Sequence, residues 1–192
     1  MDRVQKSVAA YSHDPHGYAR EHASKMADRV DRFITLLPKE AQTLDAGCGP
    51  GRDLERFVAA GHRPVGIDLN SDFVAIASEF APVIEGDLRN LASCFRERSF
   101  DAVWASASLV HLDDAEALEV LQAFHRLLRD GGHLYACVMS KGQTGWLEES
   151  DGSRWYRAWP AHEFTALVES AGFAVDDEID GPYVEIWATR LG

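Results

Sequence analysis

Residues Thr43–Asp53 read Thr-Leu-Asp-Ala-Gly-Cys-Gly-Pro-Gly-Arg-Asp, an apolar strand end followed by three alternating glycines and the start of a helix. Alternate glycines after a strand allow a tight turn with positive φ and let backbone N–H groups approach a ligand with no Cβ in the way. Seventeen residues after Gly51, a second apolar run, Val65–Asp68, ends in an acid, where a ribose diol needs a carboxylate acceptor. Together the two features imply an adenosine-bearing cofactor.

The glycine spacing distinguishes between cofactors. In the dinucleotide pattern G-x-G-x-x-G/A, the last small residue lets the helix pack closely over a pyrophosphate. Here that position is Arg52, and the run Gly47-x-Gly49-x-Gly51 is preceded by the acidic Asp45. This departure from the dinucleotide pattern argues against NAD or FAD as the cofactor.

The same segment resembles the first motif of class I S-adenosylmethionine-dependent methyltransferases, above all of small bacterial members with Gly-Pro/Ser-Gly-Arg-Asp. The likeness continues in order through four further segments: Glu85–Leu88, Phe100–Ser106, Leu109–Leu112 and Leu127–Gly132. The resemblance implies an α/β fold, a Rossmann-like doubly wound seven-stranded sheet. This sheet is mostly parallel with an antiparallel terminal strand, and helices cover both faces.

The pattern along the chain agrees with that architecture. Apolar periodicity and turn residues predict the following elements: helix 26–37, helix 52–60, strand 64–68, a helix capped by Ser71, strand 82–85, strand 102–105, a helix from Asp113 or Asp114 that Gly131-Gly132 ends, strand 133–139, helix 163–170, and strands 173–179 and 183–189. The alternation predicts parallel βαβ units with a ligand at the carboxyl ends of the strands. The last two strands are joined so closely that they must be antiparallel.

A chain of 192 residues that is 46% apolar predicts one domain, 1–192, with a single core. Within it we expect an N-terminal helical lid segment (1–38), a cofactor-binding core (40–139), an acceptor-site loop (140–160), and a helix with the terminal hairpin (161–192).

The charge balance indicates which kinds of partner the protein can bind. Lys plus Arg is 19 against 31 Asp plus Glu, and a formal charge of −12 would repel a phosphate backbone over most of the surface. A nucleic-acid substrate is therefore not expected, although Arg154 and Arg157 could form a local basic patch. We expect a small-molecule acceptor and a monomer or homodimer.

The cysteines and the N-terminus predict the compartment. Cys48, Cys94 and Cys137 are widely spaced and read as reduced thiols. No apolar leader and no run near the ~18–20 apolar residues of a membrane span is present, so a cytoplasmic location without a membrane partner is expected. His13, His16 and His22 lack a recognised ligand spacing, and no metal site is predicted.

The resemblance assigns cofactor-binding roles to the loop and to the strand ends. Gly47, Cys48 and Gly49 would supply the backbone beneath the methionyl part, and Asp45 would order the loop and approach the amino group or merely cap the loop. Asp68 would accept from both ribose hydroxyls, and Leu69 would lie against the adenine. Asp87 would accept from the adenine amine beside the backbone N–H of Leu88, or form an Asx turn. The carbonyls of Ala105 and Ser106 would hold the ammonium.

Two further assignments concern the rim of the cofactor site. Tyr11 and Tyr18, seven apart and followed by Ala19, match the family's N-terminal Tyr-(x)6-Tyr-Ala lid, although aromatic residues at this spacing could equally form a packing stripe. Arg52 could pair with the cofactor carboxylate, or form a surface ion pair with Asp53 or Glu55.

The acceptor side is less defined by the sequence. His111 follows the fourth predicted strand and is the candidate catalytic base, or else it braces the next helix. Segment 140–160 is long for a connection and rich in aromatic and charged residues, so it would either roof the acceptor pocket or pack as a hydrophobic flap. The candidate substrate-binding residues in it are Lys141, Trp146, Arg154 and Tyr156.

These features lead to one expected function and its alternatives. We expect a methyltransferase that uses S-adenosyl-L-methionine, releases S-adenosyl-L-homocysteine, and methylates an oxygen or nitrogen of a small molecule by in-line displacement. The alternatives are a protein that binds the cofactor without turnover and an RNA or protein methyltransferase. A nucleic-acid methyltransferase would need a contiguous basic groove leading to the methyl group.

Overall fold

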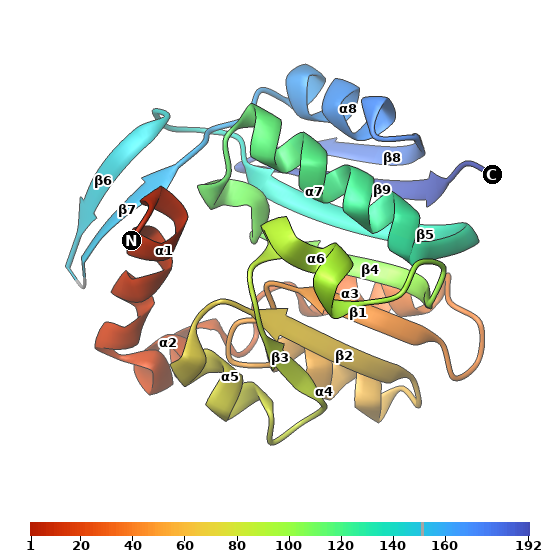
Figure 1. The fold of residues 1–192 in the computed structure, drawn as a ribbon, viewed down its shortest axis with the longest axis horizontal. Coiled ribbons are helices and arrows are strands. Elements are labelled where there is room, and N and C mark those ends of the chain that lie inside the picture. Colours follow the sequence, from red (N-terminus) through yellow and green to blue (C-terminus); the bar gives the residue numbers. More distant parts are fainter. Residues whose placement is uncertain (151) are drawn as a thin grey trace.

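The computed structural model describes residues 1–150 and 152–192, in which strands and helices alternate (Figure 1). The strands are β1 (Gln42–Ala46), β2 (Arg63–Asp68), β3 (Val83–Glu85), β4 (Phe100–Ser106), β5 (Leu128–Met139), β6 (Gly145–Glu149), β7 (Gly152–Tyr156), β8 (Phe173–Asp180) and β9 (Tyr183–Arg190). The α-helices are α1 (Arg3–Ala9), α2 (Pro15–His22), α3 (Ala27–Ile34), α4 (Arg52–Ala59), α5 (Ser71–Ala77), α6 (Leu91–Cys94), α7 (Asp114–Leu127) and α8 (Ala161–Ser170). Short 3-10 helices are η1 (Ala10–His13), η2 (Leu88–Asn90) and η3 (Leu109–His111).

Within the described residues, seven strands form one sheet in the order β3-β2-β1-β4-β5-β9-β8. β1 to β5 are parallel, and β9 runs antiparallel to both of its neighbours, β5 and β8. The predicted doubly wound, mostly parallel sheet with an antiparallel terminal strand is confirmed. The strand order reverses between β1 and β4, which is where a ligand cleft forms in such sheets.

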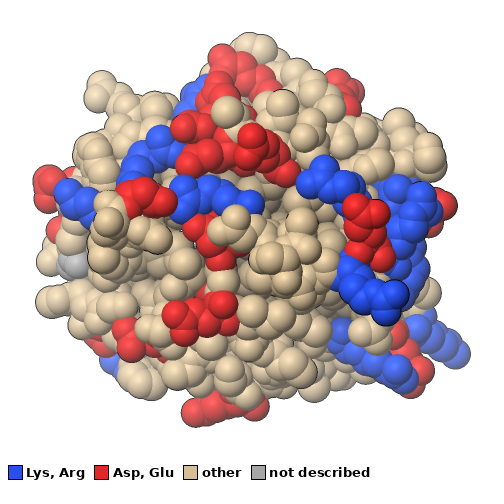
Figure 2. Space-filling model, in the orientation of Figure 1, with Lys and Arg blue, Asp and Glu red and all other residues tan. Residues whose placement is uncertain are grey.

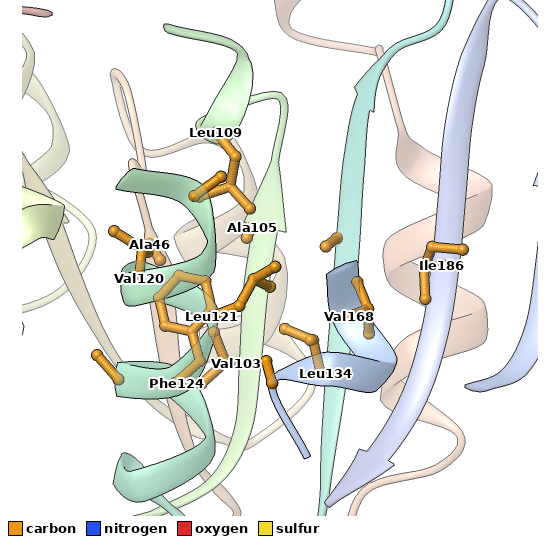
Figure 3. Packing of buried hydrophobic residues seen from close by; sticks show 14 of the residues in the cluster. Ala46, Val103, Ala105, Leu109, Val120, Leu121, Phe124, Leu134, Val168 and Ile186 are labelled. Carbon is orange, nitrogen blue, oxygen red and sulfur yellow. The ribbon is translucent and has the colours of Figure 1, made fainter. Parts of the chain in front are cut away.

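The period of two along the strands divides the core into two layers. On one face, Leu44, Val103 and Leu134 pack against α7 and α8, and Figure 3 shows this cluster with Phe124 and Val168. On the other face lie the side chains of the intervening strand residues and of α3 and α4, namely Val30, Phe33, Phe57, Ala102, Trp104, Tyr135, Cys137 and Trp187. Burial of both faces explains why β4 reads as a continuous apolar run.

The start of α5 and the end of α7 differ from the sequence prediction for reasons that the structure shows. α5 is capped by Asn70 and not by Ser71, because the Asn70 side chain accepts from the backbone N–H groups of Asp72 and Phe73 at 2.9 and 3.1 Å. α7 ends at Leu127, before Gly131-Gly132, because the fully buried Leu128 already pairs with Phe100 of β4. The two glycines instead occupy a register shift between β4 and β5, with φ of +72° at Gly131.

The expected acceptor-site loop, 140–160, contains a hairpin, since β6 and β7 pair antiparallel as a separate two-stranded sheet; residue 151 lies outside the described residues. Helix α1 lies beside β7, at the left of Figure 1. The Trp155 N–H donates to Ser7 Oγ at 2.9 Å, and the guanidinium of Arg3 lies 4.1 Å from the centroid of the Trp155 ring. Residues 3–22 together with β6 and β7 are therefore one unit, which we call the cap.

Polar contacts join the cap to the sheet. The Asn70 amide donates to the Val8 carbonyl and to Ser12 Oγ, both at 3.1 Å. At the other end of α1, Arg3 pairs with Asp113 and Glu116 at the start of α7. These contacts hold the cap over the carboxyl ends of the strands.

Candidate functional site

The carboxyl ends of β1 to β4 surround a cavity beneath the cap, which we call the inner cavity. The cap contributes apolar and aromatic side chains to it, and the loops after the strands contribute glycines, acids and small residues. Its lining consists of Val4, Val8, Tyr11, Tyr18, Gly47, Gly49, Asp68, Leu69, Phe73, Gly86, Asp87, Leu88, Ser106, Ala107, Ser108, His111 and Leu112.

The glycine loop is held in a left-handed conformation by the neighbouring strand. The N–H groups of Gly47 and Cys48 donate to the Ile67 carbonyl at 2.8 and 3.1 Å, and φ is +75°, +53° and +90° at Gly47, Gly49 and Gly51. Only glycine adopts such angles without strain. The Cys48 thiol is buried, which raises its pKa, so the thiol is an unreactive packing group. Cys48 therefore contributes to the site only through its backbone.

Gly47 and Gly49 differ in what a side chain would meet. A Cβ at Gly47 would overlap Ser108 Cβ, whereas a Cβ at Gly49 has no atom within 4 Å and faces open space. We expect Gly47→Ala to lower the free energy of unfolding by about 2–4 kcal/mol, from overpacking plus left-handed strain, and Gly49→Ala by only ~1–2 kcal/mol. Urea denaturation of the pair measures this difference. Equal losses of stability would contradict the steric account.

Asp68, at the end of β2, faces the inner cavity with its carboxylate partly used. Oδ2 accepts from the Gly49 N–H and Oδ1 from the Asn70 N–H, both at 2.8 Å. A carboxylate has about four lone-pair sites, so acceptor capacity remains for a ligand. Leu69 lines the cavity beside it.

Asp87 follows β3 and also lines the inner cavity, with Leu88 beside it. Its carboxylate accepts from the backbone N–H of Arg89 at 2.9 Å, and the Arg89 guanidinium binds it as well as Asp2 and Glu116. The Asx-type turn and the position at the cavity thus occur together. Arg89 also connects this edge of the cavity to the start of α1.

A second, narrower space lies beside the glycine loop, and we call it the loop cavity. It is lined by Tyr18, Ala19, His22, Asp45, Gly47, Cys48, Gly49, Pro50, Arg52, Asp53 and Ser106. Arg52 binds Asp53 through Nε and Nη2 at 2.7 and 2.6 Å, and donates from Nη1 to the His22 carbonyl. The pair is largely buried, and Asp53 also accepts from Trp104 Nε1 at 2.9 Å.

Asp45 is the buried acid of this loop cavity. Among the described residues its Oδ2 has no hydrogen-bond partner. Burial, and then the charge of Asp53, raise the pKa of Asp45 well above its ordinary value. An unpartnered buried carboxyl oxygen is costly unless a ligand donates to it.

The end of β4 forms the floor between the cavities. Ser106 lines both the inner and the loop cavity, while Ala105 is fully buried beneath it and lines neither. Ala107, with φ of +55°, and Ser108 continue the wall. Ala107 and Ser108 were not predicted from the sequence as site residues, and neither were Phe73, Val4 and Val8. The i, i+4 spacing of Val4 and Val8 is the signal that could have indicated these two valines.

Tyr11 and Tyr18 both belong to the cap, and their rings meet edge to face with centroids 5.2 Å apart. Each also packs on Phe73. Burial raises the pKa of both tyrosines, that of Tyr18 to about 12. Both hydroxyls therefore stay protonated at neutral pH.

A third space, the outer cavity, adjoins the other two. Its lining comprises Tyr11, Tyr18, Glu21, His22, Ala107, Val110, Met139, Glu149, Ser150, Arg154, Tyr156 and Tyr183. It shares Tyr11, Tyr18 and Ala107 with the inner cavity, and Tyr18 and His22 with the loop cavity. A ligand in one space would therefore lie next to a ligand in another.

The four predicted substrate residues separate into two groups. Arg154 and Tyr156 line the outer cavity; the Arg154 guanidinium lies 4.0 Å from the centroid of the Tyr11 ring and pairs with Glu149. Lys141 is exposed, and Trp146 is 43% exposed beneath the Lys6 ammonium. Neither lines any of the three cavities.

His111 lies at the junction of the sheet, α1–η1 and the hairpin. Its Nδ1 is 2.7 Å from the Trp155 carbonyl, so Nδ1 carries the proton, and Nε2 then accepts from the Tyr11 hydroxyl at 3.0 Å. Burial lowers the pKa of His111 to about 4. Both nitrogens are engaged inside the protein, and the start of α7 is capped by Asp113, not by His111.

The family model described as a methyltransferase domain matches residues 43–132, from β1 into β5. Residues 43–132 are a methyltransferase domain, and the curated and structural neighbours are class I S-adenosylmethionine-dependent methyltransferases. The matched part holds the glycine loop, Asp68 and Asp87, while the cap lies largely outside it.

Relatives of this chain are about a quarter to a third identical to it over the aligned residues. A ubiquinone biosynthesis O-methyltransferase of Xanthomonas axonopodis pv. citri is 26% identical over 81% of this chain and 71% of its own length. A 27-O-demethylrifamycin SV methyltransferase of Amycolatopsis mediterranei is 31% identical over 62% of this chain. The match covers only 48% of that relative.

Solved structures show the same fold. The 1,6-didemethyltoxoflavin-N1-methyltransferase of Burkholderia thailandensis, determined with its substrate and S-adenosylhomocysteine, aligns with a TM-score of 0.78 at 22% identity. The alignment covers 96% of this chain and 87% of that one.

The residues around the inner and loop cavities fit the family's cofactor. Asp68 has acceptor capacity for a diol, Asp45 Oδ2 has no partner among the described residues and suits an ammonium, and Gly49 faces open space. Within the same residues, no cluster of three or more His, Cys, Asp or Glu could hold a metal ion. No helix in residues 1–150 or 152–192 is long and apolar enough to cross a membrane.

Proposed function

We propose that this methyltransferase methylates an oxygen or nitrogen atom of a small molecule held in the outer cavity. The observation that carries the proposal is the shared wall of Tyr11, Tyr18 and Ala107, which puts the outer cavity directly against the inner one. S-adenosylmethionine, when bound, supplies an electrophilic methyl group on its sulfonium. The protein then has to align an acceptor, exclude water and receive any displaced proton.

The proposed cofactor roles follow the geometry of the strand ends. Asp68 accepts from the ribose hydroxyls, Asp87 and the Leu88 backbone bind the adenine edge, and Leu69 packs on its face. The backbone of Gly47, Cys48 and Gly49 supports the methionyl part. Asp45 and the carbonyl of Ser106 take the ammonium, whereas Ala105 lies buried beneath Ser106 and is not assigned this role. Arg52 retains two of its five N–H groups for the carboxylate, since three already serve Asp53 and His22.

The charge distribution supports a small acceptor over a nucleic acid. The ionic lining of the outer cavity consists of Glu21, Glu149 and Arg154, with the arginine paired to Glu149. Figure 2 shows the largest gathering of basic side chains at the right-hand edge, where β5 begins, away from the cap. Arg98 and Arg129 there pair with Asp130 and Asp101. These basic side chains are paired with acids and lie away from the cavities, so they do not lead a phosphate backbone to them.

An oxygen atom as the methyl acceptor is supported by the relatives named as O-methyltransferases.

Incubation with S-adenosylmethionine labelled in the methyl group and a fractionated metabolite extract tests the proposal. We expect label in at least one small product. Calorimetry should show binding of S-adenosylmethionine and S-adenosylhomocysteine but not of NADH. Tight cofactor binding without label in any fraction would favour a binding protein without turnover, and label in RNA or protein would overturn the small acceptor.

Cofactor binding should release a proton. The pKa of Asp45 is raised in the free protein, and an ammonium group beside it would favour the carboxylate and lower that pKa. Between the two pKa values binding expels the Asp45 proton, so affinity should fall as the pH drops below the pKa of the free protein. Calorimetry in buffers of different ionisation enthalpy measures the proton, and Asp45→Asn should abolish its release. Unchanged release in that variant would remove Asp45 as the source.

A further inference from the structure

His22, the last residue of α2, is the histidine that reaches both the donor and the acceptor side. It lines the loop cavity together with Asp45 and Gly47, and the outer cavity together with Tyr156. Its ring stacks on that of Tyr18, with centroids 3.9 Å apart and planes inclined by 15°. This position between two cavities depends on the fold, because the local sequence around His22 carries no motif.

Hydrogen bonding determines which nitrogen of His22 is available. Nδ1 lies 2.9 Å from the Tyr18 carbonyl, and a carbonyl oxygen can only accept, so Nδ1 carries the proton. In the neutral ring Nε2 therefore has the lone pair. Within residues 1–150 and 152–192 no hydrogen bond joins Nε2 to another group, in contrast to His111, whose Nε2 accepts from Tyr11.

Other polar groups of the outer cavity are poor proton acceptors. The hydroxyls of Tyr11, Tyr18 and Tyr156 have raised pKa values because they are buried, so they remain protonated. Glu149 already binds Arg154 and the Tyr156 hydroxyl. Glu21 is exposed, and an exposed carboxylate is a weaker base than imidazole at neutral pH.

We propose that His22 is the catalytic base, taking the proton of the acceptor hydroxyl or N–H group on Nε2, and this rests on the function proposed above. The acceptor heteroatom forms its bond to the methyl group as the methyl–sulfur bond breaks, its own proton passes to Nε2, and the sulfur keeps the electron pair. Because His22 is only half-buried, the imidazolium then loses that proton to water.

The charges around His22 keep the free ring neutral. Burial lowers the pKa of His22, and Lys25 on the following turn and Arg52 of α4 lower it further, whereas the Tyr18 carbonyl and Glu21 act in the opposite direction. Across the outer cavity the hairpin presents Arg154 and Glu149, and across the loop cavity lie Asp45 and Asp53. A neutral imidazole at pH 7 is the form that can accept a proton.

The first experiment needs no turnover. Nitrogen-15 spectra of histidine-labelled protein, alone and with S-adenosylhomocysteine, should assign the Nδ1–H tautomer to the His22 signal, which His22→Gln removes. Phenol added to the complex should shift the Nε2 resonance of His22 and leave that of exposed His16 in place. A neutral His22 protonated on Nε2, or no response of Nε2 to phenol, would overturn the proposal.

The second experiment uses phenols of graded acidity with labelled S-adenosylmethionine, comparing wild type, His22→Gln and the control His16→Gln from the same helix. We expect His22→Gln to lower kcat by about 100-fold or more for weakly acidic phenols and hardly at all for phenols already ionised. Wild-type kcat should rise with pH through the His22 pKa, below about 6.5, and the variant should lose that limb. If His22→Gln has the kcat of wild type for every phenol of the series, His22 is not the catalytic base. The absence of label in every protein would count against the proposed function, and the tautomer and phenol response would still decide on His22.

Discussion

Asp68→Ala should lower the affinity for S-adenosylmethionine and S-adenosylhomocysteine by about 10²- to 10⁴-fold. Each hydrogen bond to a charged group contributes ~1.5–3 kcal/mol, and Asp68 is proposed to accept from two ribose hydroxyls, which gives about 3–6 kcal/mol. The substitution also leaves the N–H groups of Gly49 and Asn70 without their acceptor, so the glycine loop loses its support. Calorimetry with S-adenosylhomocysteine measures the loss.

The matched control is Asp72→Ala, which removes the same charge from an exposed position four residues further along the chain. It should bind the cofactor as wild type does. Asp68→Asn keeps one carbonyl oxygen and should fall between the two. If Asp68→Ala stays folded by circular dichroism and still binds within tenfold of wild type, the ribose assignment is wrong.

Trp104→Ala should produce the second large effect, a loss of about 3–5 kcal/mol in the free energy of unfolding. The Trp104 ring is fully buried, stacks on Tyr135 with centroids 4.0 Å apart, and contacts Phe33. This loss is a large fraction of the ~5–15 kcal/mol of a typical domain. Urea denaturation followed by circular dichroism measures it.

Trp104→Phe isolates the polar part of the same residue. It keeps an aromatic ring in the stack but removes the Nε1 donor to the buried Asp53, which should remove about 1–3 kcal/mol. Because Asp53 holds Arg52, cofactor affinity should fall as well. Trp146→Ala, at a partly exposed position beside Lys6 of α1, should change stability by less than about 1 kcal/mol. A larger loss there than at Trp104 would contradict the burial argument.

The cofactor side could be predicted because its signals are local. Gly47, Asp68 and Asp87 each stand directly after a strand, and parallel strands bring such positions to one edge. Helix ends were less predictable: Gly131-Gly132 resembles a helix stop, but burial of Leu128 against β4 begins the strand first. The end of α7 therefore depends on a contact between residues that are far apart in the sequence, Phe100 and Leu128.

The acceptor side could be predicted only in part, since its residues come from distant segments. Arg154 and Tyr156 line the outer cavity, whereas Trp146 pairs with Trp155 and lies on the other face of the hairpin, against Lys6 of α1. Because this segment was expected to be a loop, the alternation of side chains between the two faces of β6 and β7 was not predicted. His22 has no sequence signal at all, because its importance comes from the two cavities on either side of it.

The cap also has a consequence for synthesis of the chain. The bond from the Trp155 N–H to Ser7 spans 148 positions, and that from Tyr11 to His111 spans 100. Contacts of such sequence separation form late, since the intervening chain must first be ordered. On the ribosome α1 emerges long before β7, its partner in the cap. The strands β1 to β5 can therefore become ordered before the cap closes over them, and slowing translation after β5 should separate the two events.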